Sequence, residues 1–319
     1  MLEDAACALV DAAGVELCLK FHGLQRGKCR FGKECHRSHK APGAASLAIH
    51  RQLLDAKDAA EAAQRAAEAE QQRAIEASEA ARPLPPWLHA ARAELRFDAP
   101  SAIGMAAAAR AFLECDSLER LHEVAALDAA RPPACPTLIS AYKRAGRALP
   151  KSWRSALLKQ TKTLKRLNAT PAYAAFLDAY RAFVRDAVVP QIGGPVVYQC
   201  PPTLRVSMPG SKCIDVHTDA DYARHESAEI NYWVPLTDVA ASNTLFLESR
   251  PGEGDYRPVE MGLGTGLRFD GQRCRHYTKA DAAATTRVSF DFRVVPASLW
   301  RDVHGGKMGD YGVERGSVT

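Results

Sequence analysis

The sequence lacks any apolar run long enough to cross a membrane. A membrane-spanning helix needs about 20 mostly apolar residues, and no stretch of 18 apolar residues occurs in the 319-residue chain. The opening segment, "MLEDAACALVDAAGVELCLK", also lacks the basic start and the continuous apolar stretch of a secretory signal peptide. We therefore expect an intracellular protein, cytoplasmic or nuclear, without a membrane partner.

Strong net charge is lacking as well. The formal net charge is +5, which is too small to indicate a partner. Basic residues are instead concentrated in two stretches: residues 18–40 carry seven Lys or Arg against one acidic residue, and residues 141–168 carry nine against none. The second stretch could bind nucleic acid, although a basic helix face is more commonly only solvated.

The nine cysteines come without a secretory signal, which favours a reducing compartment where thiols stay free or bind metal. Four potential ligands have the spacing C-x10-C-x5-C-x3-H, namely Cys18, Cys29, Cys35 and His39. Zn²⁺ takes four nitrogen and sulfur ligands in a tetrahedron, and three Cys with one His are a standard set. So small a segment needs a bound metal to fold stably. We therefore predict a structural Zn²⁺ site.

This stretch, "CLKFHGLQRGKCRFGKECHRSH", resembles the CCCH zinc finger family, most specifically in its second half. The resemblance implies a finger over residues 1–43 that binds single-stranded RNA or a protein. In an RNA-binding finger, Phe21 and Phe31 would stack on bases, although packing beside the metal is the alternative. The basic residues that would contact phosphates are Lys20, Arg30, Lys33 and Arg37.

Glycine and proline are absent from residues 46–82, where Ala, Glu, Gln, Lys and Arg predominate. These residues are strong helix formers, and few large apolar residues accompany them. We therefore predict a solvated, semi-rigid helical spacer over residues 44–82. A coiled coil is the alternative, with mainly Ala at its core positions. The segment "RPLPPW" then ends the helix and opens a second domain.

The second domain begins with helical patterns and continues with strand patterns. Apolar residues recur at helical spacing through residues 83–190, and after Gly194 the period changes from 3.6 to 2. The segments that predict strands are "PVVYQC", "TLRVSM", "KCIDVHTD", "AEINYWVPL", "NTLFLES", "GLRFDG" and "TRVSFDFRVV". Helices followed by strands favour an α+β fold over a parallel α/β sheet. Many short strands favour a sandwich, barrel or jelly roll over residues 191–300, with residues 301–319 as a tail.

His217 and Asp219 stand close together in the segment "VHTDADY". On a strand, residues i and i+2 point to the same face, as two ligands of one metal must. A third ligand should come from another strand, and His276 is the candidate. Two His and one carboxylate on one side of an ion are the ligands of non-haem Fe(II) oxygenases, which keep positions open for substrate and O₂. The pair alone is a weak signal, and Asp221 is an alternative carboxylate on the same face.

The segment "TRVSFDFRV" strengthens this interpretation. One face of the predicted strand carries the apolar residues Val288, Phe290, Phe292 and Val294, which should pack under the helices. The other face carries Arg287, Ser289, Asp291 and Arg293. Charges inside a barrel are costly unless they are paired or bind a ligand. Arg287 can offer a bidentate fork to a carboxylate, and without one it should lie beside water or an acid such as Asp291.

The order H-x-D, distal His and Arg-x-Ser resembles the Fe(II)/2-oxoglutarate dioxygenase superfamily. More narrowly, "HTDADYARHESAEINYWVPLTDV", "NTLFLESRPGEGDYRP" and "FDGQRCRHYT" resemble StrG-like proteins of streptomycin biosynthesis, which are related to phytanoyl-CoA-type dioxygenases. The resemblance covers about residues 170–296. It implies a double-stranded β-helix, or jelly-roll, core with His217, Asp219 and His276 as iron ligands. It also implies that Arg287 and Ser289 bind the distal carboxylate of 2-oxoglutarate.

The same resemblance implies a reaction. Enzymes of this kind use Fe²⁺, oxidise the co-substrate 2-oxoglutarate with O₂ to succinate and CO₂, and abstract hydrogen from a second substrate. Related halogenases lack the carboxylate ligand, so Asp219 favours hydroxylation. Asn231, Tyr198 and Arg205 are expected to contact cofactor or substrate, with ordinary hydrogen bonding inside the barrel as the alternative for Asn231 and Tyr198.

Three functions therefore remain open. The first is a 2-oxoglutarate-dependent hydroxylase that the finger directs to RNA or a protein. The second is a nucleic-acid-binding protein with a non-catalytic barrel, which the set of His217, Asp219, His276 and Arg287 disfavours. The third is an enzyme acting on a small metabolite, in which the finger serves only for docking.

Overall fold

The computed structural model divides into two compact units, Met1–Ala81 and Arg82–Thr319. The residues that it describes are 9–13, 15–19, 24, 36–37, 39–89, 93–97, 99–124, 126–159, 167–222, 224–309 and 311–317. Of the four predicted zinc ligands, Cys18 and His39 are described, whereas Cys29 and Cys35 lie outside the described residues. The predicted zinc site therefore stays a prediction.

The first unit contains one long helix, α2 (Ala44–Ala80). Most of its residues are exposed, as the composition predicted for a solvated helix. Pairs of side chains one turn apart support it, including the hydrogen bond from Gln64 to Glu68 at 2.8 Å and the ion pair of Lys57 with Glu61 at 3.5 Å. None of the described helices is both long enough and apolar enough to span a bilayer.

The second unit begins with helices. Its described α-helices are α3 (Ala99–Leu113), α4 (Pro136–Arg144), α5 (Lys151–Leu158), α7 (Pro171–Phe183) and α8 (Val189–Ile192), and the π-helical turn Val184–Val188 joins the last two. The start of α7 follows from its sequence, because the Thr170 side chain accepts a hydrogen bond from the Tyr173 N–H at 3.3 Å and Pro171 occupies the first turn.

The strands form two antiparallel sheets. The large sheet has the order β1-β7-β4-β9-β2-β11-β10, and β3 also pairs with β9. Its strands are β1 (Ala93–Arg96), β2 (Val196–Cys200), β3 (Thr203–Ser207), β4 (Ile230–Pro235), β7 (Thr265–Phe269), β9 (Arg287–Pro296), β10 (Lys307–Met308) and β11 (Tyr311–Gly316). The small sheet has the order β6-β5-β8, with β5 (Leu245–Leu247), β6 (Arg257–Pro258) and β8 (His276–Thr278). Helices combined with antiparallel sheets agree with the predicted α+β class.

Two parts of the strand prediction differ from the structure. The segment "KCIDVHTD" forms only an isolated bridge from His217 to His276, and Asp219 begins a 3-10 turn, Asp219–Asp221. The sequence led us to expect His217 and Asp219 on one face of a strand. This prediction is wrong, because Asp219 lies in a turn. The predicted tail is also more ordered than expected, because β11 pairs with β2 along Gly312–Gly316.

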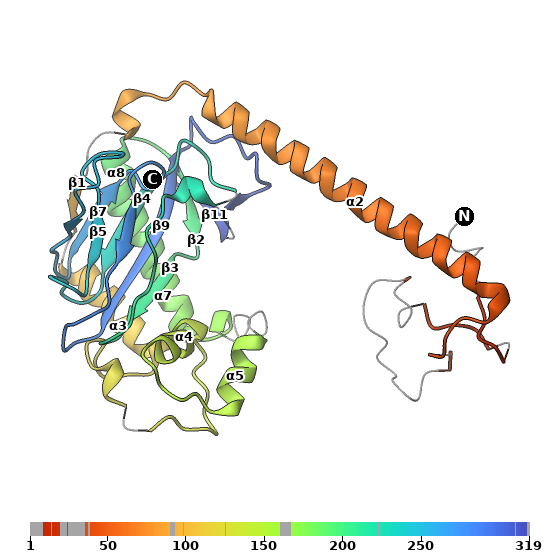
Figure 1. The fold of residues 1–319 in the computed structure, drawn as a ribbon. Helices are drawn as coiled ribbons and strands as arrows, with labels where there is room; N and C mark the ends of the chain where they lie inside the picture. Colours follow the sequence, from red (N-terminus) through yellow and green to blue (C-terminus); the bar gives the residue numbers. More distant parts are fainter. Residues whose placement is uncertain are drawn as a thin grey trace. The chain divides into compact units, whose positions relative to one another are not determined.

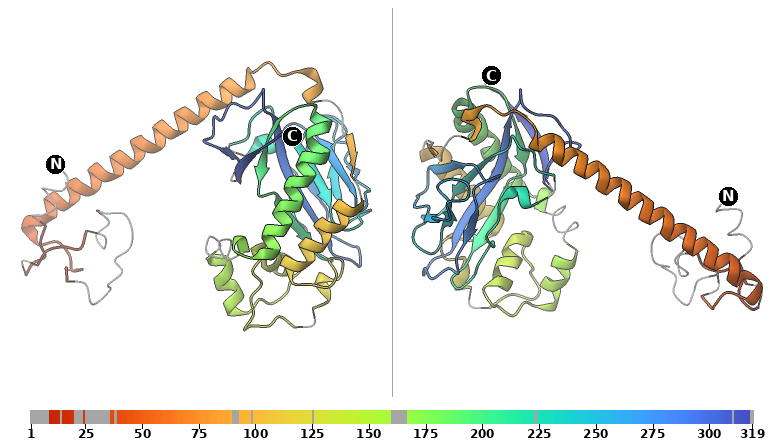
Figure 2. Two further views of the ribbon diagram at one scale, coloured as in Figure 1. Left: turned by 180° about the vertical axis from the view of Figure 1, so that it is seen from behind. Right: turned by 45° about the horizontal axis from the view of Figure 1, so that its top comes forward.

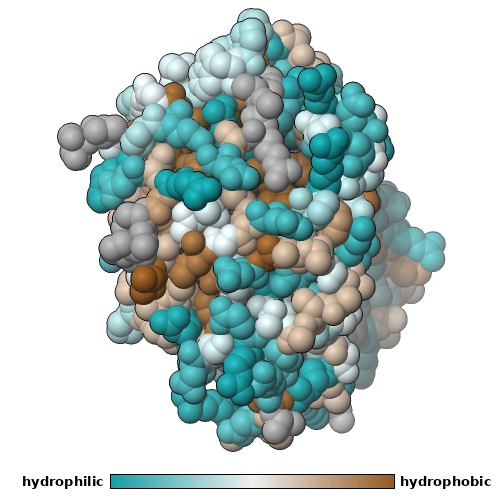
Figure 3. Space-filling model, turned by 90° about the vertical axis from the view of Figure 1, so that its left-hand side faces the viewer, coloured by the Kyte–Doolittle hydropathy of each residue, from teal (hydrophilic) through white to brown (hydrophobic). Residues whose placement is uncertain are grey.

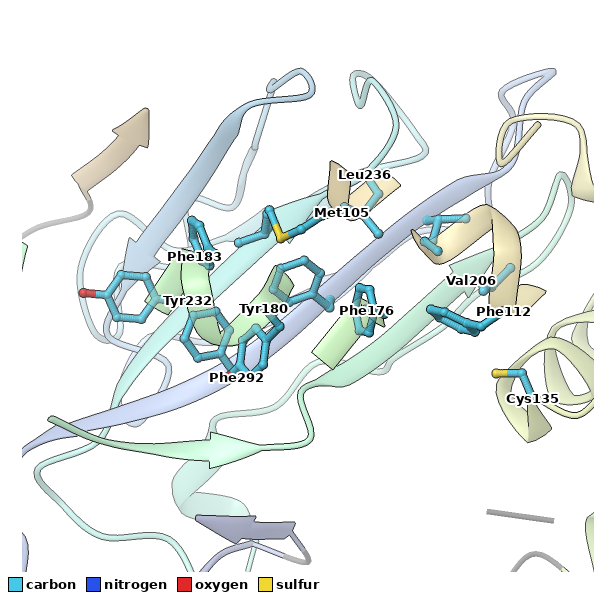
Figure 4. Close-up of a cluster of buried hydrophobic side chains, with 14 of the residues drawn as sticks. Met105, Phe112, Cys135, Phe176, Tyr180, Phe183, Val206, Tyr232, Leu236 and Phe292 are labelled. Carbon is cyan, nitrogen blue, oxygen red and sulfur yellow. The ribbon is translucent and has the colours of Figure 1, made fainter. Parts of the chain in front are cut away.

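The core lies between the helices and the large sheet (Figures 1 and 2). The ring of Tyr180 in α7 lies 5.8 Å from that of Phe290 and 5.1 Å from that of Phe292, and Phe176 lies 5.9 Å from Phe290. Figure 4 shows Phe176, Tyr180 and Phe292 within this cluster. The apolar face of β9 therefore packs under the helices, as its alternation predicted. Its polar face is turned toward the other side of the sheet. On the outer surface, hydrophilic and hydrophobic residues are interspersed on the face shown in Figure 3.

Candidate metal centre

Three side chains converge at the bridge between residues 217 and 276. The backbone N–H of each histidine donates to the carbonyl oxygen of the other, at 3.2 and 2.9 Å. The Asp219 N–H donates to the Gly271 carbonyl at 2.8 Å. The Nε2 atoms of His217 and His276 each lie 3.8 Å from Asp219 Oδ1, and the three ligand atoms lie within 4.8 Å of one another. Segments far apart in the sequence thus bring together two imidazoles and one carboxylate.

Hydrogen bonds orient both histidines for metal binding. His217 Nδ1 lies 2.8 Å from the Asp215 carbonyl oxygen, and His276 Nδ1 lies 3.1 Å from that of Cys274. A carbonyl oxygen only accepts hydrogen bonds, so Nδ1 of each ring must carry the proton. In the neutral rings the Nε2 lone pairs then face Asp219, which is how metal-binding histidines are commonly oriented. Burial lowers the pKa of His276, which favours its neutral form.

Asp219 is completely buried, and both oxygens of its carboxylate accept hydrogen bonds. Oδ2 accepts from Asn231 Nδ2 at 2.6 Å and from Arg293 Nε at 2.9 Å, and Oδ1 accepts from Arg293 Nη2 at 3.1 Å. Burial alone would raise the pKa of Asp219, but the charge and hydrogen bonds of Arg293 outweigh it and hold the pKa well below its ordinary value. The carboxylate is therefore ionised at neutral pH, as a metal ligand must be.

The alternative carboxylate, Asp221, is hydrogen-bonded to the main chain of its own turn. Its Oδ2 accepts a hydrogen bond from the Thr218 N–H at 2.8 Å and caps the turn that begins at Asp219. This backbone hydrogen bond lowers the pKa of Asp221, which is exposed. Asp221 does not belong to the three-residue cluster, so the structure favours Asp219 over Asp221.

A small pocket with a cavity volume of about 30 Å³, partly continuous with solvent, opens at these residues. Its polar lining includes His217, His276, Asn231, Arg205, Arg287, Asp291 and Arg293, and its apolar lining includes Ile214, Trp233, Leu245 and Phe269. Arg287, Asp291 and Arg293 of the polar face of β9 therefore line a pocket, as the sequence predicted for a barrel interior, whereas Ser289 is buried and is not part of the lining. Cys274, Gln272 and Glu248 are buried but do not line this pocket.

Arg287 is almost completely buried in this pocket, with 1% of its surface exposed. Its Nη1 donates to the Asn243 carbonyl at 2.9 Å, while its Nε has no partner among the described residues. The expected acid is not bonded to it, because Asp291 pairs with Arg205 at 2.8 Å and Arg293 at 3.3 Å. Burial lowers the pKa of Arg287. A guanidinium so poorly compensated is suited to an incoming anion.

Two further polar atoms near the pocket lack partners within the described ranges, Ser289 Oγ and Asn231 Oδ1. Both residues are buried.

Tyr198, which was predicted to contact the cofactor, does not lie with Ser289 and Asn231. Its hydroxyl donates to Glu314 at 2.9 Å, and its ring packs 5.8 Å from that of Tyr180 on the helix side of the sheet. The structure therefore does not support a cofactor role for Tyr198.

Sequence reasoning missed the roles of Arg293, Gln199 and Gly271. Arg293 was expected on the polar face of β9 but without a contact to Asp219, yet it bonds Asp219 directly. Gln199 follows Tyr198 on β2 and accepts from Arg293 Nη1 at 3.2 Å. A Cβ at Gly271 would lie 2.4 Å from the Asn231 side chain, so any other residue there would have to displace the Asn231 amide. No signal in the sequence marked this close approach.

Comparisons with known proteins give one clear relative. No family model matches the chain. A Streptomyces griseus protein named streptomycin biosynthesis protein StrG is 33% identical over 140 residues, which are 41% of this chain and 66% of that protein. The aligned part thus covers slightly less than two thirds of StrG. This similarity agrees with the StrG-like resemblance of the sequence, while the name of the relative specifies no reaction.

Solved structures give weaker similarities. SnoK, a non-heme alpha ketoglutarate dependent carbocyclase from nogalamycin biosynthesis, is 14% identical with a TM-score of 0.33, over 57% of this chain and 95% of that chain. AviO1 from Streptomyces viridochromogenes is 12% identical with a TM-score of 0.34, over 71% of this chain and 97% of that chain. Similarity at this level establishes neither a shared fold nor a shared activity.

Proposed function

We propose that the chain is an Fe(II)/2-oxoglutarate-dependent oxygenase, most specifically a hydroxylase, built on a double-stranded β-helix. The observation that carries this proposal is the convergence of His217, Asp219 and His276 beside a pocket that both histidines and the poorly compensated Arg287 line. A metal centre of this composition and a buried anion-binding group in one pocket are what the reaction requires. A non-catalytic barrel would have no need of either.

The donor set fits Fe²⁺. His217 and His276 would bind through Nε2, since hydrogen bonds occupy Nδ1 of each ring. Asp219 would bind through Oδ1, the oxygen that lies 3.8 Å from both Nε2 atoms. Two His and one carboxylate leave positions open for a chelating co-substrate and O₂. Iron bound in this way would supply the activation of O₂.

The chemistry of the pocket lining supports 2-oxoglutarate as the co-substrate. Arg287 would bind the distal carboxylate through its unbonded Nε edge, and the Ser289 hydroxyl would add a donor. The apolar side chains of Trp233, Leu245 and Phe269 would contact the methylene groups and exclude water. Asn231 has an unbonded Oδ1 and would accept a hydrogen bond from a hydroxyl or water near the metal.

The N-terminal unit is proposed to direct this activity. Cys18, Cys29, Cys35 and His39 would bind one structural Zn²⁺, and the finger would contact single-stranded RNA or a protein partner. Residues 1–43 would form the finger, 44–82 the spacer and 83–300 the oxygenase region with its helices. This part of the proposal rests on the spacing of the ligands in the sequence.

Turnover of 2-oxoglutarate tests the oxygenase proposal. Protein loaded with Fe²⁺ should release succinate and consume O₂ in the presence of 2-oxoglutarate and pools of RNA, protein or metabolites. The His217→Ala variant should lose this activity while remaining folded, whereas His304→Ala, at a histidine outside the pocket lining, should keep it. Full activity of His217→Ala would refute the assignment of the metal centre.

A further inference from the structure

Arg293 holds the carboxylate of Asp219 from one side. Its Nε and Nη2 donate to Oδ2 and Oδ1 at 2.9 and 3.1 Å, and its side chain is only 10% exposed. The guanidinium is itself fixed, because Nη1 donates to Gln199 Oε1 at 3.2 Å and to Asp291 Oδ2 at 3.3 Å. The bidentate geometry therefore fixes the rotation of the Asp219 carboxylate and also stabilises its ionised form.

The two oxygens of Asp219 are not equivalent. Oδ2 accepts two hydrogen bonds, from Arg293 Nε and from Asn231 Nδ2 at 2.6 Å. Oδ1 accepts one and is the oxygen that faces Nε2 of both histidines. A metal that bound both oxygens would have to displace the hydrogen bonds to Oδ2. The arrangement therefore favours binding through Oδ1 alone.

A positive charge at this place would not be expected in a site built only for tight metal binding. A guanidinium beside the ligand of a cation repels that cation, and buried charges interact strongly. The neighbouring acid, Asp291, is shared between Arg293 and Arg205, so it compensates the charge of Arg293 only in part. Arg293 must therefore contribute something other than metal affinity.

We propose that Arg293 and Asn231 are positioning residues that hold Asp219 as a one-oxygen ligand and so keep a coordination position free for 2-oxoglutarate. This inference rests on the proposed function and concerns the same site. A chelating co-substrate needs two adjacent positions, and O₂ needs a third. A carboxylate bound through both oxygens would occupy one of these three coordination positions.

Protein loaded with Co²⁺ in the absence of 2-oxoglutarate tests this inference without turnover. The visible absorption of Co²⁺ reports its coordination number. In Arg293→Gln we expect a changed spectrum, as Asp219 binds through both oxygens, and a Co²⁺ affinity equal to or tighter than that of the wild type. The affinity of the Fe²⁺-loaded variant for 2-oxoglutarate should fall by about tenfold or more, a loss of about 1.4 kcal/mol.

Three further variants make the test specific. Arg293→Lys keeps the charge but loses the fork, so it should give an intermediate spectrum. Asn231→Ala removes a hydrogen bond to Oδ2 and leaves Arg293 in place, so it should shift the Co²⁺ spectrum in the same direction as Arg293→Gln. It also supplies the test if Arg293→Gln does not fold. The matched control is Arg181→Lys, because Arg181 forms a similar bidentate pair with Glu314, at 2.9 and 2.8 Å, outside the pocket lining. It should change neither measurement.

The outcomes separate this inference from the proposed function. A wild-type Co²⁺ spectrum in Arg293→Gln and Asn231→Ala would overturn the positioning role. A parallel loss of Co²⁺ and 2-oxoglutarate binding in both variants would also overturn it, since that result indicates only a structural role. If the wild type itself binds no 2-oxoglutarate when loaded with Fe²⁺, the proposed function fails instead.

Discussion

His217 and His276 face each other across a single antiparallel bridge, and their ring centroids lie 4.3 Å apart. Two backbone hydrogen bonds join them, at 3.2 and 2.9 Å. Because these bonds are made by the main chain, they hold the two rings side by side. We therefore expect substitutions at particular neighbours of these rings to lower metal affinity and turnover.

One such neighbour is Gly271. A methyl group there would lie 2.4 Å from the Asn231 amide, and the Gly271 carbonyl anchors the Asp219 N–H. We expect Gly271→Ala to displace both contacts and to lower Co²⁺ affinity and turnover by about tenfold or more, since hydrogen bonds to charged groups contribute about 1.5–3 kcal/mol. Isothermal titration with Co²⁺ measures this.

The control for this variant is Gly104→Ala in α3, where an added methyl group meets nothing within 4 Å. It should keep Co²⁺ affinity and stabilise the protein by about 0.5–1 kcal/mol, because alanine is the better helix former. Unchanged Co²⁺ binding in Gly271→Ala would show that the close approach to Asn231 does not position the metal centre.

A buried histidine should make stability depend on pH. His225 Nδ1 lies 2.6 Å from Glu229 Oε2. Burial alone would lower the pKa of His225, but the hydrogen bond and charge of Glu229 raise it above its ordinary value. A raised folded-state pKa means that the contribution to stability is fully present below the unfolded pKa, about 6.5, and is lost as pH rises through the folded pKa.

The wild type and His225→Gln should therefore differ most in free energy of unfolding at pH 5.5 to 6. The difference should shrink progressively toward pH 9. Urea unfolding of the metal-free proteins across this range measures it. A difference that stays constant, or that grows with rising pH, would contradict the assigned direction of the pKa shift.

The packing of α7 on β9 should carry much of the stability of the second unit. Phe176 is 1% exposed and contacts Phe290 and Phe112. We expect Phe176→Ala to lower the free energy of unfolding by about 3–5 kcal/mol. Leu158→Ala, at a side chain that is 89% exposed, should change it by no more than about 0.5 kcal/mol. Equal effects of the two substitutions in urea unfolding would contradict this description of the core.

Much of this arrangement could be predicted from local sequence. The alternation of "TRVSFDFRVV" identified β9 and both of its faces, because a strand that separates a core from a pocket must alternate strictly. The absence of glycine and proline from residues 46–82 likewise predicted α2. In both cases the pattern repeats over many residues, so tertiary contacts do not override it.

The contacts among the polar residues could not be predicted in the same way. The sequence placed Asp291 near Arg287, yet β9 pairs with β3 so that Asp291 lies within reach of Arg205. The partner of Arg293 is Asp219, from a turn that the sequence indicated as a strand. These contacts depend on strand register and on main-chain turns, and neither leaves a periodic signal in the sequence.

The most direct test of the account is an anaerobic titration of Fe²⁺-loaded protein with 2-oxoglutarate, followed by the charge-transfer absorption that the chelated complex gives. The wild type should bind one equivalent saturably, and Arg287→Lys should bind about tenfold more weakly or worse, because lysine loses the guanidinium fork. Arg154→Lys, at an exposed arginine of α5, should bind as the wild type does. Absence of saturable binding in the wild type would contradict the oxygenase proposal, and wild-type affinity in Arg287→Lys would contradict the role of Arg287.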